Sequence, residues 1–193
     1  MQLIYTIGHS TRTLDELVTL LRENGVTRLA DIRRYPGSRR YPHFSRESLA
    51  KSLPAAGIEY HHLEDLGGRR KPLPDSPNTA LRNEQFRAYA DYMATPEFHT
   101  AVDRLTGSDQ TTASMCAEAV PWKCHRNLLS DELLRRGLRV VHILGPGSQK
   151  EHEMTKLATI NGDRVEYRAL QETFGAPVSS PAPGRGGGRR RRG

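Results

Sequence analysis

The sequence has few cysteines and no long hydrophobic segment. Two cysteines in 193 residues are too few for the disulfide framework of a small secreted protein, so we expect reduced thiols, although a redox disulfide between Cys116 and Cys124 stays open. No apolar run approaches membrane-spanning length, and the amino terminus lacks the charged-then-apolar pattern of a signal peptide. We therefore expect a cytoplasmic protein with no membrane partner.

Several familiar site motifs are also missing. The sequence contains no Walker loop, no G-x-G-x-x-G fingerprint, no C-x-x-C pair and no H-E-x-x-H. These absences argue against the common phosphate-binding loops, against thioredoxin-like redox chemistry and against the usual zinc sites. We therefore expect neither a metal nor a cofactor.

Positive charge is concentrated at the carboxyl end. Five arginines lie in residues 176–193, which leaves a formal charge of only +2 for the rest of a chain whose total is +7. The same segment is rich in Pro, Ser and Gly and has no acidic or aromatic residue, so it cannot bury enough apolar surface to fold alone. We expect one α/β domain over residues 1–175, followed by a disordered basic tail.

Arginine in a glycine-rich arm suits phosphate contacts that do not depend on base sequence. Nucleic acid or a nucleotide is therefore the expected partner. A tail that only increases solubility is the alternative.

Strand and helix patterns alternate along the chain. Apolar strands are expected at residues 3–7 and 26–32, with a helix capped by Thr13 between them, and a strand at 111–116 precedes a helix at 127–136 and a strand at 138–144. This order predicts a mostly parallel, Rossmann-like sheet flanked by helices, with ligands at the carboxyl ends of the strands. A helix around 149–157 and a short strand at 165–169 are expected to complete the domain.

One segment of thirteen residues, 114–126, concentrates the reactive side chains. It contains both cysteines, the only tryptophan and several polar groups: Cys116, Glu118, Trp122, Cys124, His125 and Arg126. Cys124 falls at the expected start of a helix beside Lys123, where free N–H groups and cations favour a thiolate. Cys116 is either a small core residue that ends a strand or a second thiol that resolves the first.

Polar residues also follow the first two strands. His9, Ser10 and Thr11 come directly after the first, although His9 could simply bond to the backbone. After the second, residues 33–44 alternate four arginines with aromatic rings, a composition that can pair phosphates and stack bases. A solvated loop whose tyrosines pack on the sheet is the alternative. Asp31 is interpreted as an ion-pair partner or a supporting carboxylate rather than a free base.

Several of these motifs together resemble a known family. They are Thr6–Thr11, Asp31–Arg33 with Pro36, Ser38 and Arg39, Leu66–Gly68, Met115–Glu118 and Cys124–Arg126. In combination, over roughly residues 1–145, they are similar to the bacterial and archaeal family called domain of unknown function 488. The resemblance implies an α/β fold and a shared polar site, but no established reaction.

The residues favour an enzyme that acts on nucleic acid or a nucleotide. We expect hydrolysis or transfer at a phosphate or glycosidic centre, with damaged-base processing as one member of that class. The candidate catalytic residues are Cys124, Glu118, His9 and Asp31. The candidate substrate-binding residues are Ser10, Thr11, Arg33, Ser38, Arg39, Tyr41, Trp122, His125 and Arg126.

Arg33, Arg39 and Arg126 are expected to converge on one anion site, because they follow strand ends that share a sheet edge. Two other functions stay open. One is a thiol-dependent sulfur-transfer or redox protein that uses Cys124, and the other is a non-catalytic nucleic-acid-binding module.

Overall fold

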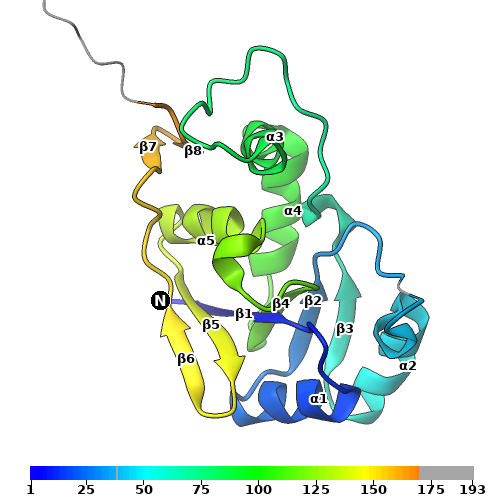
Figure 1. Cartoon of the computed structure of the whole chain (residues 1–193). Coiled ribbons are helices and arrows are strands. Elements are labelled where there is room, and N and C mark those ends of the chain that lie inside the picture. Colours follow the sequence, from blue (N-terminus) through cyan, green and yellow to red (C-terminus); the bar gives the residue numbers. More distant parts are fainter. Residues whose placement is uncertain (38, 170–193) are drawn as a thin grey trace, which may run out of the picture.

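The computed structural model describes residues 1–37 and 39–169, and its centre is a six-stranded sheet in the order β3-β2-β4-β1-β5-β6 (Figure 1). Strands β1 to β5 run parallel, and β6 is antiparallel to β5. The sheet strands are β1 Leu3–Gly8, β2 Arg28–Asp31, β3 Glu59–His62, β4 Thr112–Cys116, β5 Arg139–Gly145 and β6 Ser148–Glu151. A separate hairpin pairs β7 Thr159–Asn161 with β8 Arg164–Glu166.

Helices cover both faces of this sheet. They are α1 Leu14–Glu23, α2 Arg46–Ala55, α3 Glu84–Met93, α4 Pro96–Thr106 and α5 Arg126–Arg135, with short 3₁₀ turns at Pro42–Phe44, Glu64–Leu66 and Pro121–Lys123. The mostly parallel, helix-flanked α/β fold predicted from the sequence is confirmed. Among the described residues, none of the helices combines the length and the apolar character that crossing a membrane would need.

Side-chain alternation along the strands divides the core into two layers. Ile7 on β1 and Met115 on β4 point toward α1 and α2, whereas Ile4 on β1 packs with residues of α3, α4 and α5. Polar residues occupy the α5 side of the sheet as well, including Thr6 and His142, both of which are buried. The α5 layer therefore contains buried polar groups that need hydrogen-bond partners.

Local sequence signals explain where the first helix starts. The Thr13 hydroxyl accepts a hydrogen bond from the Glu16 backbone N–H at 3.2 Å, and the Glu16 carboxylate accepts one from the Thr13 N–H at 2.6 Å. This capping box satisfies two N–H groups that the helix itself leaves free. The cap predicted at Thr13 is confirmed.

The prediction of a helix around residues 149–157 is wrong. The chain turns back at Gly145-Pro146-Gly147, with Gly147 at φ 60°, and forms strand β6 against β5. All four residues of β6 are exposed, so this edge strand has no alternation of apolar and polar residues to mark it. The short strand expected at 165–169 is present only in part, because β8 covers Arg164–Glu166 and residues 167–169 are not in a strand. The tail predicted at 176–193 lies outside the described residues.

The end of β1 lies against the loop that follows β4. A Cβ atom added to Gly8 would stand 1.9 Å from the backbone oxygen of Glu118 and 2.8 Å from the Cα of Ala119. Both neighbours are backbone atoms, which cannot move aside as a flexible side chain can. Glycine at position 8 is therefore a condition for the loop to close over the strand end.

We predict that Gly8→Ala destabilises the protein by about 1–3 kcal/mol, the usual cost of forcing an extra carbon into a packed site. Gly145→Ala is the matched control, because a Cβ there meets no atom within 4 Å. Urea denaturation of both variants measures the difference. Equal stability of the two would contradict the close approach.

Candidate functional site

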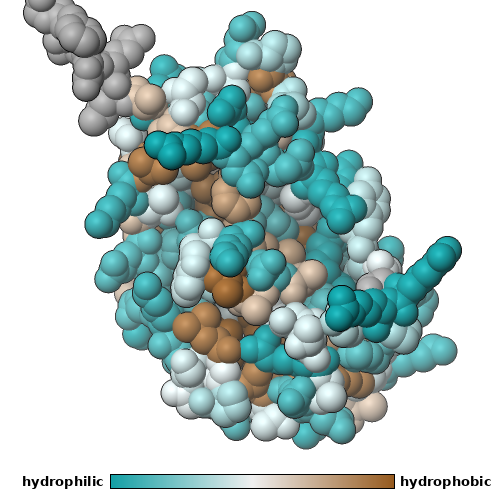
Figure 2. All heavy atoms as spheres, viewed as in Figure 1, coloured by the Kyte–Doolittle hydropathy of each residue, from teal (hydrophilic) through white to brown (hydrophobic). Residues whose placement is uncertain are grey.

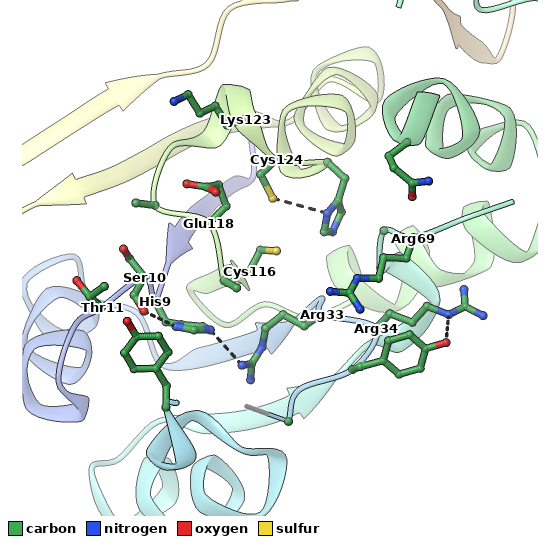
Figure 3. A pocket seen from close by; sticks show the side chains of 18 of the residues that line it. His9, Ser10, Thr11, Arg33, Arg34, Arg69, Cys116, Glu118, Lys123 and Cys124 are labelled. Atoms are coloured by element: carbon green, nitrogen blue, oxygen red, sulfur yellow. Dashed lines mark hydrogen bonds between the residues drawn. The ribbon is translucent and has the colours of Figure 1, made fainter. Parts of the chain in front are cut away.

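A cleft of about 790 Å³ opens at the carboxyl edge of the parallel strands (Figure 3). Its walls come from the segments after β1, β2 and β4, from the start of α3, and from the residues just before α5. The carboxyl edge is where parallel α/β proteins usually bind ligands. In Figure 2 the face of the molecule that is turned to the viewer is largely hydrophilic, with separate hydrophobic patches near its middle.

Backbone hydrogen bonds fasten three strand ends together under the cleft. The N–H groups of His9 and Ser10 donate to the carbonyls of Cys116 and Ala117, each at 2.9 Å, and the Ile32 N–H donates to Met115 at 2.9 Å. The residues that follow β1, β2 and β4 are therefore neighbours. These three strand ends share one edge of the sheet, as the predicted parallel order requires.

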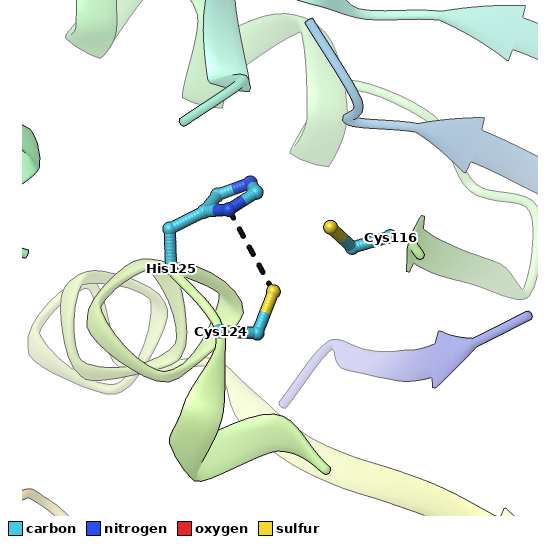
Figure 4. A group of neighbouring side chains, drawn as sticks. All are labelled: Cys116, Cys124 and His125. Atoms are coloured by element: carbon cyan, nitrogen blue, oxygen red, sulfur yellow. Dashed lines mark hydrogen bonds between the residues drawn. The ribbon is translucent and has the colours of Figure 1, made fainter. Parts of the chain in front are cut away.

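Two thiols and an imidazole meet on the floor of the cleft (Figure 4). Cys116 ends β4, while Cys124 and His125 directly precede α5, and their ligand atoms lie within 4.8 Å of one another. Cys124 Sγ is 3.6 Å from His125 Nδ1. The placement of Cys124 just before the helix, as predicted from the sequence, is confirmed.

The two thiols have opposite acidities. A hydrogen bond donated by Cys116, and then contacts with His125, hold the pKa of Cys124 well below its ordinary value, despite burial. The pKa of Cys116 is raised well above its ordinary value, because it donates that bond and is buried. Of the two thiols, Cys124 is therefore the one that loses its proton more readily.

Glu118 is the carboxylate of the cleft wall. Its side chain is exposed, and its Oε1 lies 3.5 Å from the Val120 backbone N–H. None of the ion pairs among the described residues involves Glu118. Its oxygens are therefore available to accept a proton from a bound molecule or from water.

Arg126 lies beneath the cleft and does not line it. Its side chain is only 1 % exposed; it donates to the carbonyls of Glu118 and Ala119, the latter at 3.3 Å, and to Thr6 Oγ1 at 3.3 Å. The sequence suggested a substrate-binding role for Arg126. In the structure this guanidinium holds the loop that carries Glu118 instead, because its Nη2 donates to the two backbone oxygens and its Nη1 to the Thr6 hydroxyl.

Asp31 and Arg33 are bound to each other. Arg33 Nε donates to Asp31 Oδ1 at 2.8 Å, and the Tyr60 hydroxyl donates to Asp31 Oδ2 at 2.8 Å. Asp31 is fully buried and does not line the cleft, so the ion-pair interpretation of this carboxylate is confirmed and it has no path to a substrate. Arg33 does line the cleft, next to His9.

His9 is held as a neutral imidazole. Arg33 can only donate, so His9 Nε2 accepts its N–H at 3.1 Å, which leaves the proton on Nδ1 for the Ser10 carbonyl at 3.0 Å. Burial and then the Arg33 charge lower the pKa of His9 to about 4, and its ring stacks on Phe44 with centroids 4.3 Å apart. His9 lines the cleft, but its lone pair is already occupied.

The cleft unites only some of the residues proposed from the sequence. Those that line it are His9, Ser10, Thr11, Arg33, Tyr41, Cys116, Glu118, Cys124 and His125. Arg39 is exposed outside it, and Trp122, which is 53 % exposed, lies under Lys150 with the ammonium nitrogen 5.6 Å from its ring centroid. Ser38 lies outside the described residues. The structure does not bring Arg33, Arg39 and Arg126 to one exposed anion site.

Tyr35, which the sequence offered as a stacking ring, and Lys123, noted as a cation beside Cys124, also line the cleft. Lining residues that were not proposed individually from the sequence include Arg34, Gly68, Arg69, Gln85 and Phe86. Among all these lining residues, Arg34, Arg69 and Lys123 add positive charge, and Figure 3 shows the Arg69 side chain directed toward the cleft. The signal for Arg69 was the Arg69-Arg70-Lys71 run, which begins a basic, proline-rich stretch that the sequence predicts as a surface loop or lid near the same edge.

A buried hydrogen-bond chain starts from Arg126 and crosses the α5 layer. Thr6 Oγ1 is 2.7 Å from His142 Nδ1, His142 Nε2 is 3.0 Å from His152 Nδ1, and His152 Nε2 is 2.8 Å from Asp131 Oδ1. When both imidazoles are neutral, Thr6 and the two histidines each accept one hydrogen bond and donate one. All the donors then point the same way, from the guanidinium to the carboxylate. Burial, followed by the neighbouring His152, lowers the pKa of His142 to about 3. Sequence reasoning missed this chain.

The fold and the cleft define an α/β protein with a thiol-containing polar site at the carboxyl edge of a parallel sheet. The chain belongs to the family described as "Domain of unknown function DUF488", whose model matches residues 13–133. This confirms the resemblance noted in the sequence, over a shorter range than 1–145. No curated protein and no solved structure matched the chain.

The buried imidazole of His9 generates a prediction about acid stability. Its pKa is about 4 in the folded protein and 6.5 when unperturbed, so between these values the unfolded chain binds the extra proton. Stability should therefore fall as the pH is lowered from about 6.5 to about 4. His9→Gln should reduce this slope, whereas His61→Gln, which alters an exposed histidine, should not. Urea midpoints at pH 7 and pH 5 provide the measurement, and identical slopes in all three proteins would contradict the prediction.

Proposed function

We propose that this chain is an enzyme that acts on a nucleotide or nucleic acid in this cleft, by transfer or hydrolysis at a phosphate or glycosidic centre, with Cys124 as the nucleophile. The observation that carries the proposal is the position of Cys124 Sγ, on the cleft floor and 3.6 Å from His125 Nδ1. A nucleophile next to an imidazole is the arrangement by which enzymes activate thiols.

The charge of the cleft supports an anionic substrate. Arg33, Arg34, Arg69 and Lys123 line it, against the single carboxylate of Glu118. The Arg33 guanidinium is occupied by Asp31, so the exposed Arg69 and Lys123 and the half-buried Arg34 are the cations available to a phosphate.

Aromatic side chains beside these cations favour a ligand that also carries a flat ring. Tyr35, Tyr41 and Phe86 line the same cleft, and Tyr35 is 66 % exposed. Stacking on an aromatic side chain is the common, sequence-tolerant way in which proteins hold an unpaired base. Cations that can bind a phosphate and rings that can stack on a base, together in one cleft, suit a nucleotide as the ligand.

The chemistry of the proposed reaction follows from two side chains. The Cys124 thiolate attacks the electrophilic centre, and the leaving group departs with the electron pair of the broken bond. Glu118 then takes a proton from water or an acceptor hydroxyl, whose oxygen displaces Cys124 and restores the thiolate. Cys116 keeps its proton and donates a hydrogen bond to Cys124 between turnovers.

Paired substitutions test the two roles. Against a panel of nucleotides and short oligonucleotides, we expect Cys124→Ser to lower kcat at least about 100-fold, and Glu118→Gln to do the same for hydrolysis. Glu97→Gln, on the exposed first turn of α4, is the control. Loss in the Glu118 variant alone would assign the reaction to activated water. Full activity in both variants would show that the cleft is not the active site.

Arg69 tests the substrate class. Replacing it by Gln should weaken binding of a labelled single-stranded oligonucleotide and make the salt dependence of log K shallower by about 0.7, the contribution of one phosphate contact. Lys51→Gln removes one positive charge from an exposed position on α2 and is the matched control. An unchanged salt dependence in the Arg69 variant would show that Arg69 does not contact a phosphate of the oligonucleotide.

A further inference from the structure

We propose that Cys116, Cys124 and His125 form a binding site for a thiophilic divalent cation, with Zn²⁺ as the ion whose chemistry fits best (Figure 4). Among the described residues, this is the group of His, Cys, Asp and Glu side chains whose ligand atoms cluster closely enough to hold an ion. This proposal goes beyond the reaction proposed above, because it assigns a metal ion to the floor of the same cleft.

The ligand geometry already suits a tetrahedral ion. Zn–S bonds of about 2.3 Å and Zn–N bonds of about 2.0–2.1 Å place sulfur and nitrogen ligands about 3.5 Å apart at tetrahedral angles. The distance from Cys124 Sγ to His125 Nδ1 is 3.6 Å. Both side chains could therefore bind one ion with little movement, and Cys116 needs only a small adjustment to complete three ligands.

The imidazole of His125 is available for coordination. Its Nε2 is buried without a hydrogen-bond partner in the described part of the protein, and its ring packs against Tyr89 with centroids 5.0 Å apart. On the other side, a Cβ added to Gly68 would lie 3.0 Å from Nδ1. Packing thus holds the ring in place with Nδ1 facing the Cys124 sulfur at 3.6 Å, and Nδ1 is the nitrogen that would bind the ion.

The charges and protons balance on binding. Cys124 supplies a thiolate, Cys116 loses its proton to water, and His125 binds through Nδ1 as a neutral imidazole with its one ring proton on Nε2. The two sulfur ligands then neutralise the two positive charges of the ion. Three protein ligands leave a fourth position, and it faces the cleft because Cys116, Cys124 and His125 all line it. This is the ligand count of zinc sites that bind water or a substrate.

The sequence predicted no metal here, although it offered Cys116, Cys124, His125 and Glu118 as possible ligands, because their spacing matches no zinc motif. Seven residues lie between the two cysteines, and the histidine directly follows the second, so no C-x-x-C pattern appears. Strand β4 and helix α5 bring the three side chains together only in the folded protein. Metal ligation and nucleophilic attack by Cys124 exclude each other, since both use the same sulfur lone pair, so occupancy would switch the proposed thiol reaction off.

The test is metal titration of the full chain, reduced and stripped with a chelator. We expect one Zn²⁺ per chain in competition with a chromogenic chelator, and a thiolate charge-transfer absorption band when Co²⁺ replaces it. His125→Ala should weaken binding at least about tenfold. His61→Ala, at an exposed position, should leave the affinity unchanged. Bound Zn²⁺ should also protect Cys124 from alkylation.

Two results would overturn the site. One is the absence of stoichiometric binding and of the Co²⁺ band in the reduced wild-type protein, which needs no variant to be folded. The other is undiminished binding in both Cys116→Ser and His125→Ala. If the ion binds as expected but only the Zn²⁺-loaded protein is active, the site stands and Cys124 is a ligand rather than the nucleophile. The failure of the proposed reaction and the failure of the metal site are thus distinguishable.

Discussion

One buried guanidinium holds the candidate site together. Arg126 is the first residue of α5 and is bonded to Thr6 on β1 and to the two carbonyls of the loop after β4. A buried arginine without partners would be strongly destabilising, so these oxygens fix its position and it fixes theirs. This contact set joins the loop that carries Glu118 to strand β1 and to the start of α5, directly after Cys124 and His125.

The charge of Arg126 is not cancelled by a direct ion pair among the described residues. The buried hydrogen-bond chain connects it, through Thr6 and the two histidines, to the carboxylate of Asp131. Because neutral groups separate the two charges, the positive field of Arg126 still reaches the floor of the cleft. It is one of the causes that lower the pKa of Cys124, after the contacts with Cys116 and His125.

Sequence patterns predicted the fold because the spacing of apolar residues reflects which side chains are buried, and capping and turn residues mark where helices and strands begin and end. The capping box at Thr13 and the apolar positions of α1 are local, and so they could be located without the structure. Strand β6 could not, because none of its side chains is buried and the hairpin turn alone specifies it. The strand-end rule likewise placed His9, Ser10 and Cys116 at one edge, since topology fixes the position of a strand end.

The directions of long side chains could not be predicted. Arg33 and Arg126 both belong to the expected segments, but each turns to partners that only the fold supplies. The closeness of Cys116 to Cys124 and His125, and the buried chain through His142, depend on the same long-range packing.

The most direct test of the central claim is the pH dependence of alkylation at each cysteine of the reduced, metal-free wild-type protein, read peptide by peptide by mass spectrometry. The account predicts that Cys124 reacts with an apparent pKa well below that of an ordinary thiol, while Cys116 stays protonated to well above it. Ordinary titration of Cys124, or the same profile at both cysteines, would contradict a thiolate held at the floor of this cleft.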